Sequence, residues 1–351
     1  YPLIDGVVNG CPSHLLEPLR TQLIQYSEAF DNAYWVKASV SLSLNQIIAP
    51  NGVLDADKIT ESSTNGEQQI YSDVITTTPS SDYVYSIFIK KGERSWVKVM
   101  TANNSGANFN VEDGVIGIVD SGITANIENY GNGWFKCSVS FNTSASADRV
   151  YVRISTSNGT TSYQGNGTSG VYIYGAQLEA GSYPTSYIPN YGTSAGITRS
   201  ADTANGAGSS TTFNSSEGVL MAEISAFEDT MNFEAITISD GTTNNEVRLY
   251  FSSTQNKLSY NLKVNGATQL DGTLVGVVFK NNNKILIKYK QNNSSLWVNG
   301  FKLLSYNSLD VFSNNVLNEI SFSRGNSSSP FYGNTKQIQY FDSALNDSDL
   351  E

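Results

Sequence analysis

The sequence is poor in the residues on which many catalytic sites and metal centres depend. It has one histidine, His14, and two cysteines, Cys11 and Cys137, in 351 residues. A Ser-His-Asp or Cys-His arrangement would have to use His14, which lies in an irregular, proline-containing segment. A zinc site needs more ligands than the chain groups together. We therefore expect neither histidine-dependent catalysis nor a zinc centre, and we interpret His14 as a loop residue.

Two cysteines are also too few for a disulfide framework. Cys137 lies in an apolar strand pattern, which predicts a buried free thiol. A Cys11–Cys137 bridge would require the N-terminal segment to lie along that strand. The sequence leaves both arrangements open.

Charge is the third scarce property. Charged residues make up 15 % of the chain, and 21 Lys and Arg against 32 Asp and Glu give a net charge of −11. Nucleic acids and anionic membranes bind clustered Lys and Arg, so we expect neither as a partner. No apolar run approaches the ~20 residues of a membrane span, so we expect no membrane insertion. Low charge with abundant hydroxyl and amide side chains is typical of an extracellular protein.

Aromatic and β-branched residues, with frequent Gly and Asn turns, are abundant and favour strands over helices. Alternating patterns predict strands in the first half at residues 40–44, 69–76, 83–90, 95–101, 133–141, 149–155 and 170–178. In the second half they predict strands at 218–225, 234–239, 246–252, 257–264, 284–290, 295–299, 318–323 and 335–341. We predict an all-β protein with two antiparallel β-sandwich (jelly-roll) domains in tandem.

The predicted domain limits follow from where these patterns begin and end. Residues 1–38 are expected to form an irregular segment that packs on the first domain, and residues 39–204 form that domain. Residues 205–211 are the expected linker, rich in Gly and Ser, and residues 212–351 form the second sandwich. Asn346 is the predicted N-cap of a short C-terminal helix. The sequence starts at Tyr1 without Met, and what precedes Tyr1 and follows Glu351 is left open.

Aromatic side chains supply the candidate binding surface. Four strands place aromatic rings or long cations on the side opposite their aliphatic residues. Rings beside hydrogen-bonding side chains suit a sugar, because pyranose C–H faces stack on aromatics. The candidate glycan-binding residues are Trp96, Trp134, Tyr151, Arg153, Tyr172 and Tyr174. The alternative is that these rings pack under loops, against the N-terminal segment or in a subunit interface.

The Asp and Glu residues form no clear pattern of a catalytic site. The closest acid triad, Asp347, Asp349 and Glu351, lies at a predicted helix start, where acids complement the dipole. We therefore predict no catalytic residue and no enzyme activity. Asp55 with Asp57, and Asp240 near a glycine turn, are candidates for a structural calcium ion, although neither forms a recognisable calcium loop. No cofactor is predicted, and calcium binding is left open.

Several stretches resemble a known family. CPSHLLEPLRTQLIQYSEAFDNAYW, VYSIFIKKGERSW, NYGNGWFKCSVSF and SGVYIYGAQLEAGSYPTSYIPNYGTSAGITRSAD cover most of residues 11–204. They are similar to the carbohydrate-binding-module-like jelly roll of tail-fibre and receptor-binding proteins from phages and prophages of Bacteroidetes. Residues 212–351 resemble a concanavalin A-like (laminin-G-like) domain through EGVLMAEIS, NKILIKYKQNNSSLWVNG and NTKQIQYFDSALNDSDLE.

This resemblance implies adhesion. The family's role is that of a non-catalytic module on the virion surface, in a tail or head fibre, that binds host cell-surface glycans. Its members are usually part of oligomeric fibres, so we expect a homo-oligomer, with a trimer favoured, and contacts with other virion proteins. Two alternatives remain: a purely structural fibre or decoration protein, and a polysaccharide depolymerase. The glycan, the host and the oligomeric state are not encoded in any motif.

Overall fold

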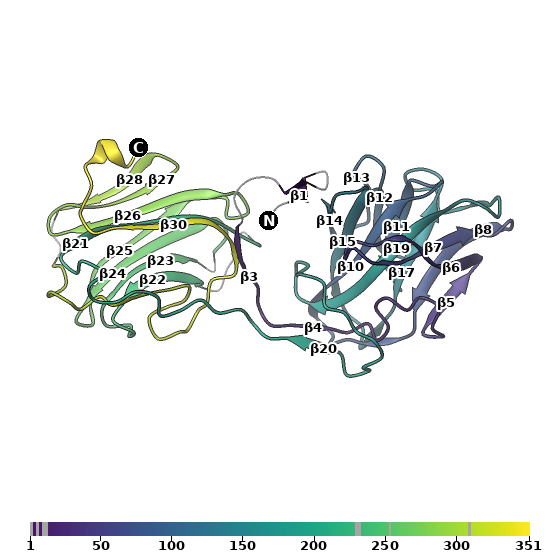
Figure 1. Cartoon of the computed structure of the whole chain (residues 1–351), viewed down its shortest axis with the longest axis horizontal. Coiled ribbons are helices and arrows are strands. Elements are labelled where there is room, and N and C mark those ends of the chain that lie inside the picture. The colour runs from purple at the N-terminus through teal and green to yellow at the C-terminus, as the bar shows by residue number, and fades with distance from the viewer. Residues whose placement is uncertain (1–2, 5–6, 9–12, 229–232, 253, 308–309) are drawn as a thin grey trace. The chain divides into compact units, whose positions relative to one another are not determined.

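The computed structural model describes residues 3–4, 7–8, 13–228, 233–252, 254–307 and 310–351. The chain divides into two compact units: unit 1 contains residues 1–10 and 19–200, and unit 2 contains residues 11–18 and 201–351 (Figure 1). Each unit is an antiparallel β-sandwich. The predicted fold class, all-β with two sandwiches in one chain, is confirmed.

Unit 1 has two main sheets. The six-stranded sheet contains, in spatial order, β14 (Ile123–Asn129), β15 (Trp134–Thr143), β10 (Ser81–Lys91), β19 (Gly170–Ala180), β7 (Leu54–Glu61) and β6 (Val40–Ile48). The seven-stranded sheet contains β13 (Val115–Val119), β12 (Gly106–Asn110), β11 (Trp96–Thr101), β17 (Val150–Ser155), β8 (Asn65–Ser72) and β18 (Ser162–Gln164), with β5 (Trp35–Ala38) paired to β8. Alternate aliphatic residues of both sheets, such as Ile87, Val139 and Val152, are fully buried in one core.

Short strand pairs complete unit 1. They are β1 (Leu3–Ile4) with β2 (Val7–Val8), β9 (Ile75–Thr76) with β16 (Ala147–Asp148), and β4 (Arg20–Gln22) with β20 (Ile197–Arg199). Gln22 is fully buried; its side-chain amide accepts from the N–H of Leu178 and donates to the carbonyl of Ala176. Residues 19–38 therefore form ordered strands and turns of unit 1, where the sequence predicted an irregular segment.

Unit 2 also has two sheets. The six-stranded sheet contains β28 (Phe301–Tyr306), β27 (Ser294–Val298), β26 (Asn283–Lys290), β21 (Glu217–Ala226), β30 (Gly333–Phe341) and β3 (His14–Leu16). The five-stranded sheet contains β25 (Ala267–Val275), β24 (Lys257–Val264), β23 (Glu246–Phe251), β22 (Ala235–Ser239) and β29 (Glu319–Ser321). Two Asn-Gly pairs of unit 2, which begin at Asn265 and Asn299, have positive φ and join neighbouring antiparallel strands. They form the hairpins that this dipeptide predicts.

Strand β3 changes the predicted domain limits. It pairs antiparallel with β30, with His14 opposite Thr335, so residues 11–18 belong to unit 2 (Figure 1). His14 is therefore a strand residue rather than a loop residue, and its ring contacts the ring of Phe322 edge-on at 5.9 Å. The predicted linker 205–211 is also not a free linker, because Ala207 forms a backbone bridge with Ile320 of unit 2. The division falls at residues 200 and 201.

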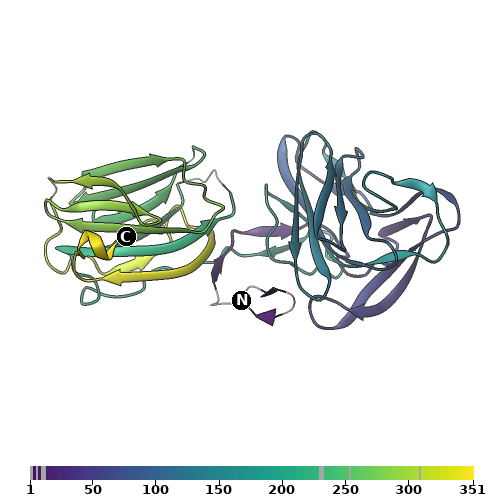
Figure 2. The ribbon, with the colours of Figure 1, turned by 90° about the horizontal axis from the view of Figure 1, so that it is seen from above.

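The C-terminal tail is a single 3₁₀ turn, η1 (Asp347–Asp349), visible at the C-terminal end of the ribbon in Figure 2. Asn346 precedes it but makes no side-chain capping bond. Asp347 instead pairs with Lys288 and Lys302, each at 2.7 Å. Its carboxylate therefore neutralises lysines on β26 and β28, the two strands that flank β27, which is a structural role.

Within the described residues, no helix has the length and apolarity that crossing a bilayer requires.

Cys137 is fully buried as a free thiol, and burial raises its pKa above the ordinary value. Cys11, and with it the Cys11–Cys137 bridge left open by the sequence, lies outside the described residues.

Candidate functional site

The six predicted glycan-binding residues all lie in unit 1, but on two different sheets. Trp96 of β11 with Tyr151 and Arg153 of β17 belong to the seven-stranded sheet. Their register places Lys98 opposite Arg153 and Met100 opposite Tyr151, so the three share one face. Trp134 of β15 with Tyr172 and Tyr174 of β19 belong to the six-stranded sheet. The six do not form one surface.

Three of the six are not accessible. Trp134 is 2 % exposed, and Tyr174 and Arg153 are each 4 % exposed. The indole N–H of Trp134 donates to the carbonyl of Ile48, and the ring packs in a small cluster with Ala49, Phe88 and Tyr174. For these three side chains the structure shows the packing alternative that the sequence left open.

Arg153 is occupied in a different way. Its guanidinium donates two hydrogen bonds to the Gln69 side chain and one to Asn104, and it pairs with Glu67 at 2.8 Å. Each of its three guanidinium nitrogens therefore has a partner within the protein. Trp96, Tyr151 and Tyr172 are half-buried and remain candidates. Tyr172 lies under the Lys58 ammonium group, which is 5.7 Å from the ring centre.

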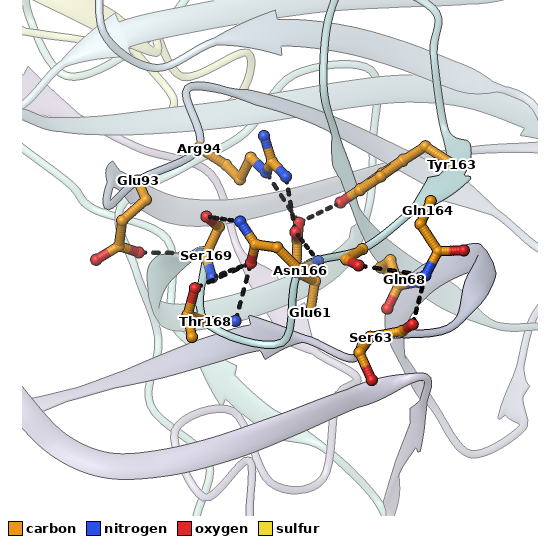
Figure 3. A network of polar contacts seen from close by, with 12 residues as sticks. Glu61, Ser63, Gln68, Glu93, Arg94, Tyr163, Gln164, Asn166, Thr168 and Ser169 are labelled. Atoms are coloured by element: carbon orange, nitrogen blue, oxygen red, sulfur yellow. Dashed lines mark hydrogen bonds and ion pairs between the residues drawn. The ribbon is translucent and has the colours of Figure 1, made fainter.

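A second polar cluster in unit 1 surrounds Glu61 (Figure 3). The buried carboxylate accepts two hydrogen bonds from Arg94, one from the Tyr163 hydroxyl and one from the N–H of Asn166. Burial alone would raise the pKa of Glu61, but these hydrogen bonds outweigh it and lower the pKa. Because the chain itself supplies these partners, the cluster holds the loop around Asn166 against β7, which is a structural role.

Unit 1 also contains a pocket of about 330 Å³, which we call the acidic pocket. It is lined by Glu28, Ala29, Asp31, Leu44, Asn45, Asp55, Asp57 and Tyr191. Its volume is at the lower end of the range for small-molecule sites, roughly 300–1,000 Å³. Three separate parts of the chain meet here: residues 28–31, the β6–β7 hairpin, and the segment after β19. Four of the eight lining residues carry carboxylates.

The hairpin supplies two of these acids. Asp55 and Asp57 are two residues apart in β7 and therefore lie on one side of the strand. Strand β6 has an irregular register between Ser43 and Ile47, and Asn45 there has a positive φ of 54°. This bulge aims the N–H of Asn45 at Asp57 Oδ1, 3.0 Å away. Asp57 is 3 % exposed, so an almost buried carboxylate forms part of the pocket wall.

Tyrosine hydroxyls gather beside these acids. Tyr174 and Tyr187 donate to Glu28 Oε1 at 2.9 and 3.0 Å, and Tyr191 is also hydrogen-bonded to Glu28. Tyr191 is 72 % exposed, so most of its surface faces solvent at the pocket. Of the predicted residues, only Tyr174 reaches this site, through its hydroxyl group. The pocket therefore combines an exposed aromatic side chain with acceptors for hydroxyl or amino groups.

The charges in the pocket are only partly compensated. Burial raises the pKa of Asp57 to about 6, and the nearby Asp31 and Asp55 act in the same direction, while the Asn45 hydrogen bond and Lys37 oppose it. Asp55 accepts from the Asn51 side chain through Oδ2, whereas its buried Oδ1 has no partner. In the described ranges, no three Asp, Glu, His or Cys side chains are grouped as a metal ion requires. Asp240, the other calcium candidate, binds Thr242 and Asn245 within its own turn.

Sequence reasoning found part of this pocket and missed the rest. Asp55 and Asp57 were noticed for their spacing, but Glu28, Asp31 and Tyr191 were not. Tyr191 was placed in the first domain without a role, and it forms a backbone bridge with Tyr26 inside unit 1. No local motif marks these residues, because the pocket arises from long-range pairing between residues about 25 and 190.

Comparison with known proteins adds little to this geometry. No protein-family model and no curated protein matches the chain. Similar solved structures include the CBM40 module of the Ruminococcus gnavus IT-sialidase bound to α2,3-sialyllactose, at 16 % identity and a TM-score of 0.32 over 38 % of this chain and 80 % of that one. A SAP-like pentraxin from Limulus polyphemus has 12 % identity and a TM-score of 0.31 over 39 % of this chain and 69 % of that one. Domains LG4-5 of the mouse laminin α1 chain have 10 % identity and a TM-score of 0.28, over 99 % of this chain and 96 % of that one. Likenesses this low assign neither a family nor a ligand.

Proposed function

We propose that unit 1 is a non-catalytic glycan-binding module whose ligand occupies the acidic pocket. The observation that carries this proposal is the placement of the exposed Tyr191 side chain beside Asp31, Asp55 and Asp57 in one pocket. Carboxylates accept hydrogen bonds from sugar hydroxyls, and aromatic side chains contribute apolar contact with a polar tip. A sugar residue presents both kinds of surface.

The wider role is proposed from the sequence. The stretches of residues 11–204 that resemble phage tail-fibre and receptor-binding proteins support an adhesin on the surface of a virion, outside the host cell. There the chain would bind host cell-surface polysaccharide and contact other virion proteins, as a homo-oligomer with a trimer favoured. The mass of the chain in solution tests the oligomer directly, and a monomer at micromolar concentration would contradict it.

The pocket proposal is tested on a glycan array with the intact chain. Tyr191→Ala should lose most of the retention shown by the unsubstituted chain, because it removes an exposed aromatic anchor. The matched control is Phe301→Ala in unit 2, because Phe301 is 71 % exposed, against 72 % for Tyr191. Equal loss in both variants, or no glycan bound by the unsubstituted chain, would overturn the proposal.

One observation favours a catalytic alternative. Asp57 has a pKa near 6 and lies close to other carboxylates, which are properties of a general acid in glycoside hydrolysis. Incubation of the chain with a broad panel of bacterial capsules decides between the two functions. Binding without new reducing ends or unsaturated sugars supports the module, and their appearance with loss in Asp57→Asn supports a depolymerase.

A further inference from the structure

The charge in the acidic pocket is of one sign. Among the residues that line it, four carry carboxylates and none is Lys or Arg. The neighbouring cation is Lys37, whose charge acts on both Asp31 and Asp57. Its ammonium group donates to the backbone carbonyls of Asp31, Asn32 and Trp35. These three bonds use all three N–H donors of a lysine, so Lys37 has none left for a ligand.

One buried oxygen atom in the pocket lacks a donor within the described residues, namely Asp55 Oδ1. The neighbouring carboxylate of Asp57 is 3 % exposed, and its Oδ1 accepts from the N–H of Asn45. An unfilled buried acceptor costs about 1–3 kcal/mol, and more when it is charged. A donor supplied by a ligand would remove that cost.

The spacing of the acidic side chains favours an organic ligand over a metal ion. A calcium ion needs several oxygens within about 2.3–2.6 Å of one point. The described acids are not grouped closely enough to hold a metal ion. They are instead distributed around a pocket of about 330 Å³, beside the exposed Tyr191. An organic ligand can place one ammonium group against a carboxylate and its hydroxyl groups against the others, at ordinary hydrogen-bond lengths.

We propose that the acidic pocket selects glycans that carry a free, positively charged amino group over their N-acetylated, neutral and acidic counterparts. This inference rests on the proposed glycan-binding function and names the substrate class of the same pocket. N-acetylation removes the charge and adds bulk, and a uronic acid or sulfate would bring a further negative charge towards the four carboxylates of the pocket. A charge-assisted hydrogen bond to a nearly buried carboxylate is the source of the selectivity.

Three β-1,4-linked hexasaccharides that differ only at carbon 2 provide the test. These probes are the hexamers of glucosamine, N-acetylglucosamine and glucose, titrated into the intact chain by calorimetry at pH 7 and 150 mM salt. The glucosamine hexamer should bind about tenfold to a hundredfold more tightly than the other two, the factor expected for one charge-assisted bond. Asp57→Asn should remove most of this difference.

The matched control for Asp57→Asn is Asp73→Asn, which removes one negative charge from a side chain that is 65 % exposed elsewhere in unit 1. It should leave the selectivity unchanged, whereas equal loss in both variants would mean that the amine responds only to net charge and would overturn the proposal. Equal affinity for all three hexamers, or tighter binding of the acetylated one, would also overturn it. In that case Tyr191-dependent retention of another glycan would still uphold the proposed function. No binding to the hexamers or to any array glycan would remove both.

Discussion

The indole N–H of Trp134 donates a 3.0 Å hydrogen bond to the backbone carbonyl of Ile48. This bond joins the first residue of β15 to the end of β6 across the outer side of the six-stranded sheet. The ring is almost fully buried in a cluster with Phe88 and Tyr174. Trp134 therefore contributes to the stability of unit 1 rather than to an accessible binding surface.

Trp134→Ala should lower the free energy of unfolding of unit 1 by about 3–5 kcal/mol, the usual cost of truncating a buried large aromatic residue. Tyr172→Ala, at a half-buried position on the same sheet, should cost far less. Urea unfolding followed by tryptophan fluorescence and circular dichroism measures both. If Trp134→Ala instead kept its unfolding midpoint and lost glycan retention, the ring would be a ligand contact.

Arg94→Met should destabilise unit 1 by about 3–5 kcal/mol, because it leaves the fully buried Glu61 carboxylate without its charge partner. The effect should depend on pH. The pKa of Glu61 is lowered in the folded chain, so the ion pair stabilises at pH values above the ordinary Glu pKa and is lost as the pH falls through the lower, folded value. Thermal unfolding at pH 7 and in acid should therefore show a smaller difference between variant and unsubstituted chain in acid. A difference that grows in acid would contradict this account.

Asp57→Asn should stabilise unit 1 at pH 7 while weakening ligand binding. The folded pKa of Asp57, about 6, exceeds the ordinary Asp value of 3.8, so ionisation costs stability as the pH rises between these values. The amide removes that cost and can still accept from Asn45, which predicts a gain of roughly 1–3 kcal/mol at pH 7 and almost none near pH 4. The charged groups that act on Asp57 are Asp31, Asp55 and Lys37. Their substitution would shift the pH range over which ionisation of Asp57 costs stability. Melting temperatures at the two pH values, with Asp73→Asn as control, measure the gain.

Cys137 should resist thiol reagents in the folded chain. It lies on β15, between strands β10 and β14, and its side chain is fully buried, so a reagent cannot reach the sulfur. Burial also raises the pKa of the thiol, which disfavours the reactive thiolate. Mass spectrometry of peptides after iodoacetamide treatment should find Cys137 unmodified in buffer and modified in urea. Rapid modification in buffer would show that β15 opens locally.

The alternation of side chains made much of the fold predictable. Strands such as β10, β15, β17 and β19 were expected within a few residues of their limits, because one side of each is aliphatic. Strands β7 and β14 were not expected, because Asp, Asn and Thr interrupt their patterns. Alternation assigns a residue to one side of a sheet, but it does not say what covers that side. This is why the sequence could not decide whether Trp134 and Tyr174 are open to a ligand or covered by other segments.

The binding pocket was predictable only in part for a related reason. Asp55 and Asp57 share a strand, so their common side follows from spacing alone. Tyr191 reaches them because residues 190–192 pair with residues 25–27, through contacts such as the Ser27 N–H donating to the Asn190 carbonyl. Contacts between segments more than 160 residues apart leave no local pattern in the sequence. Only the folded chain brings these residues together.

Because β3 pairs with β30, unit 2 cannot complete its six-stranded sheet until almost all of its residues have been synthesised. Every strand of unit 1 lies within residues 1–10 and 19–200, whereas residues 14–16 of unit 2 are paired with residues 333–335. At roughly 5–20 residues per second, the early strand waits about fifteen to sixty seconds for its partner. A chain that stops before β30 would leave both β3 and β21 with unpaired backbone groups, the kind of edge on which other chains aggregate. The six-stranded sheet of unit 2 can therefore be complete only in a chain that has been translated through β30.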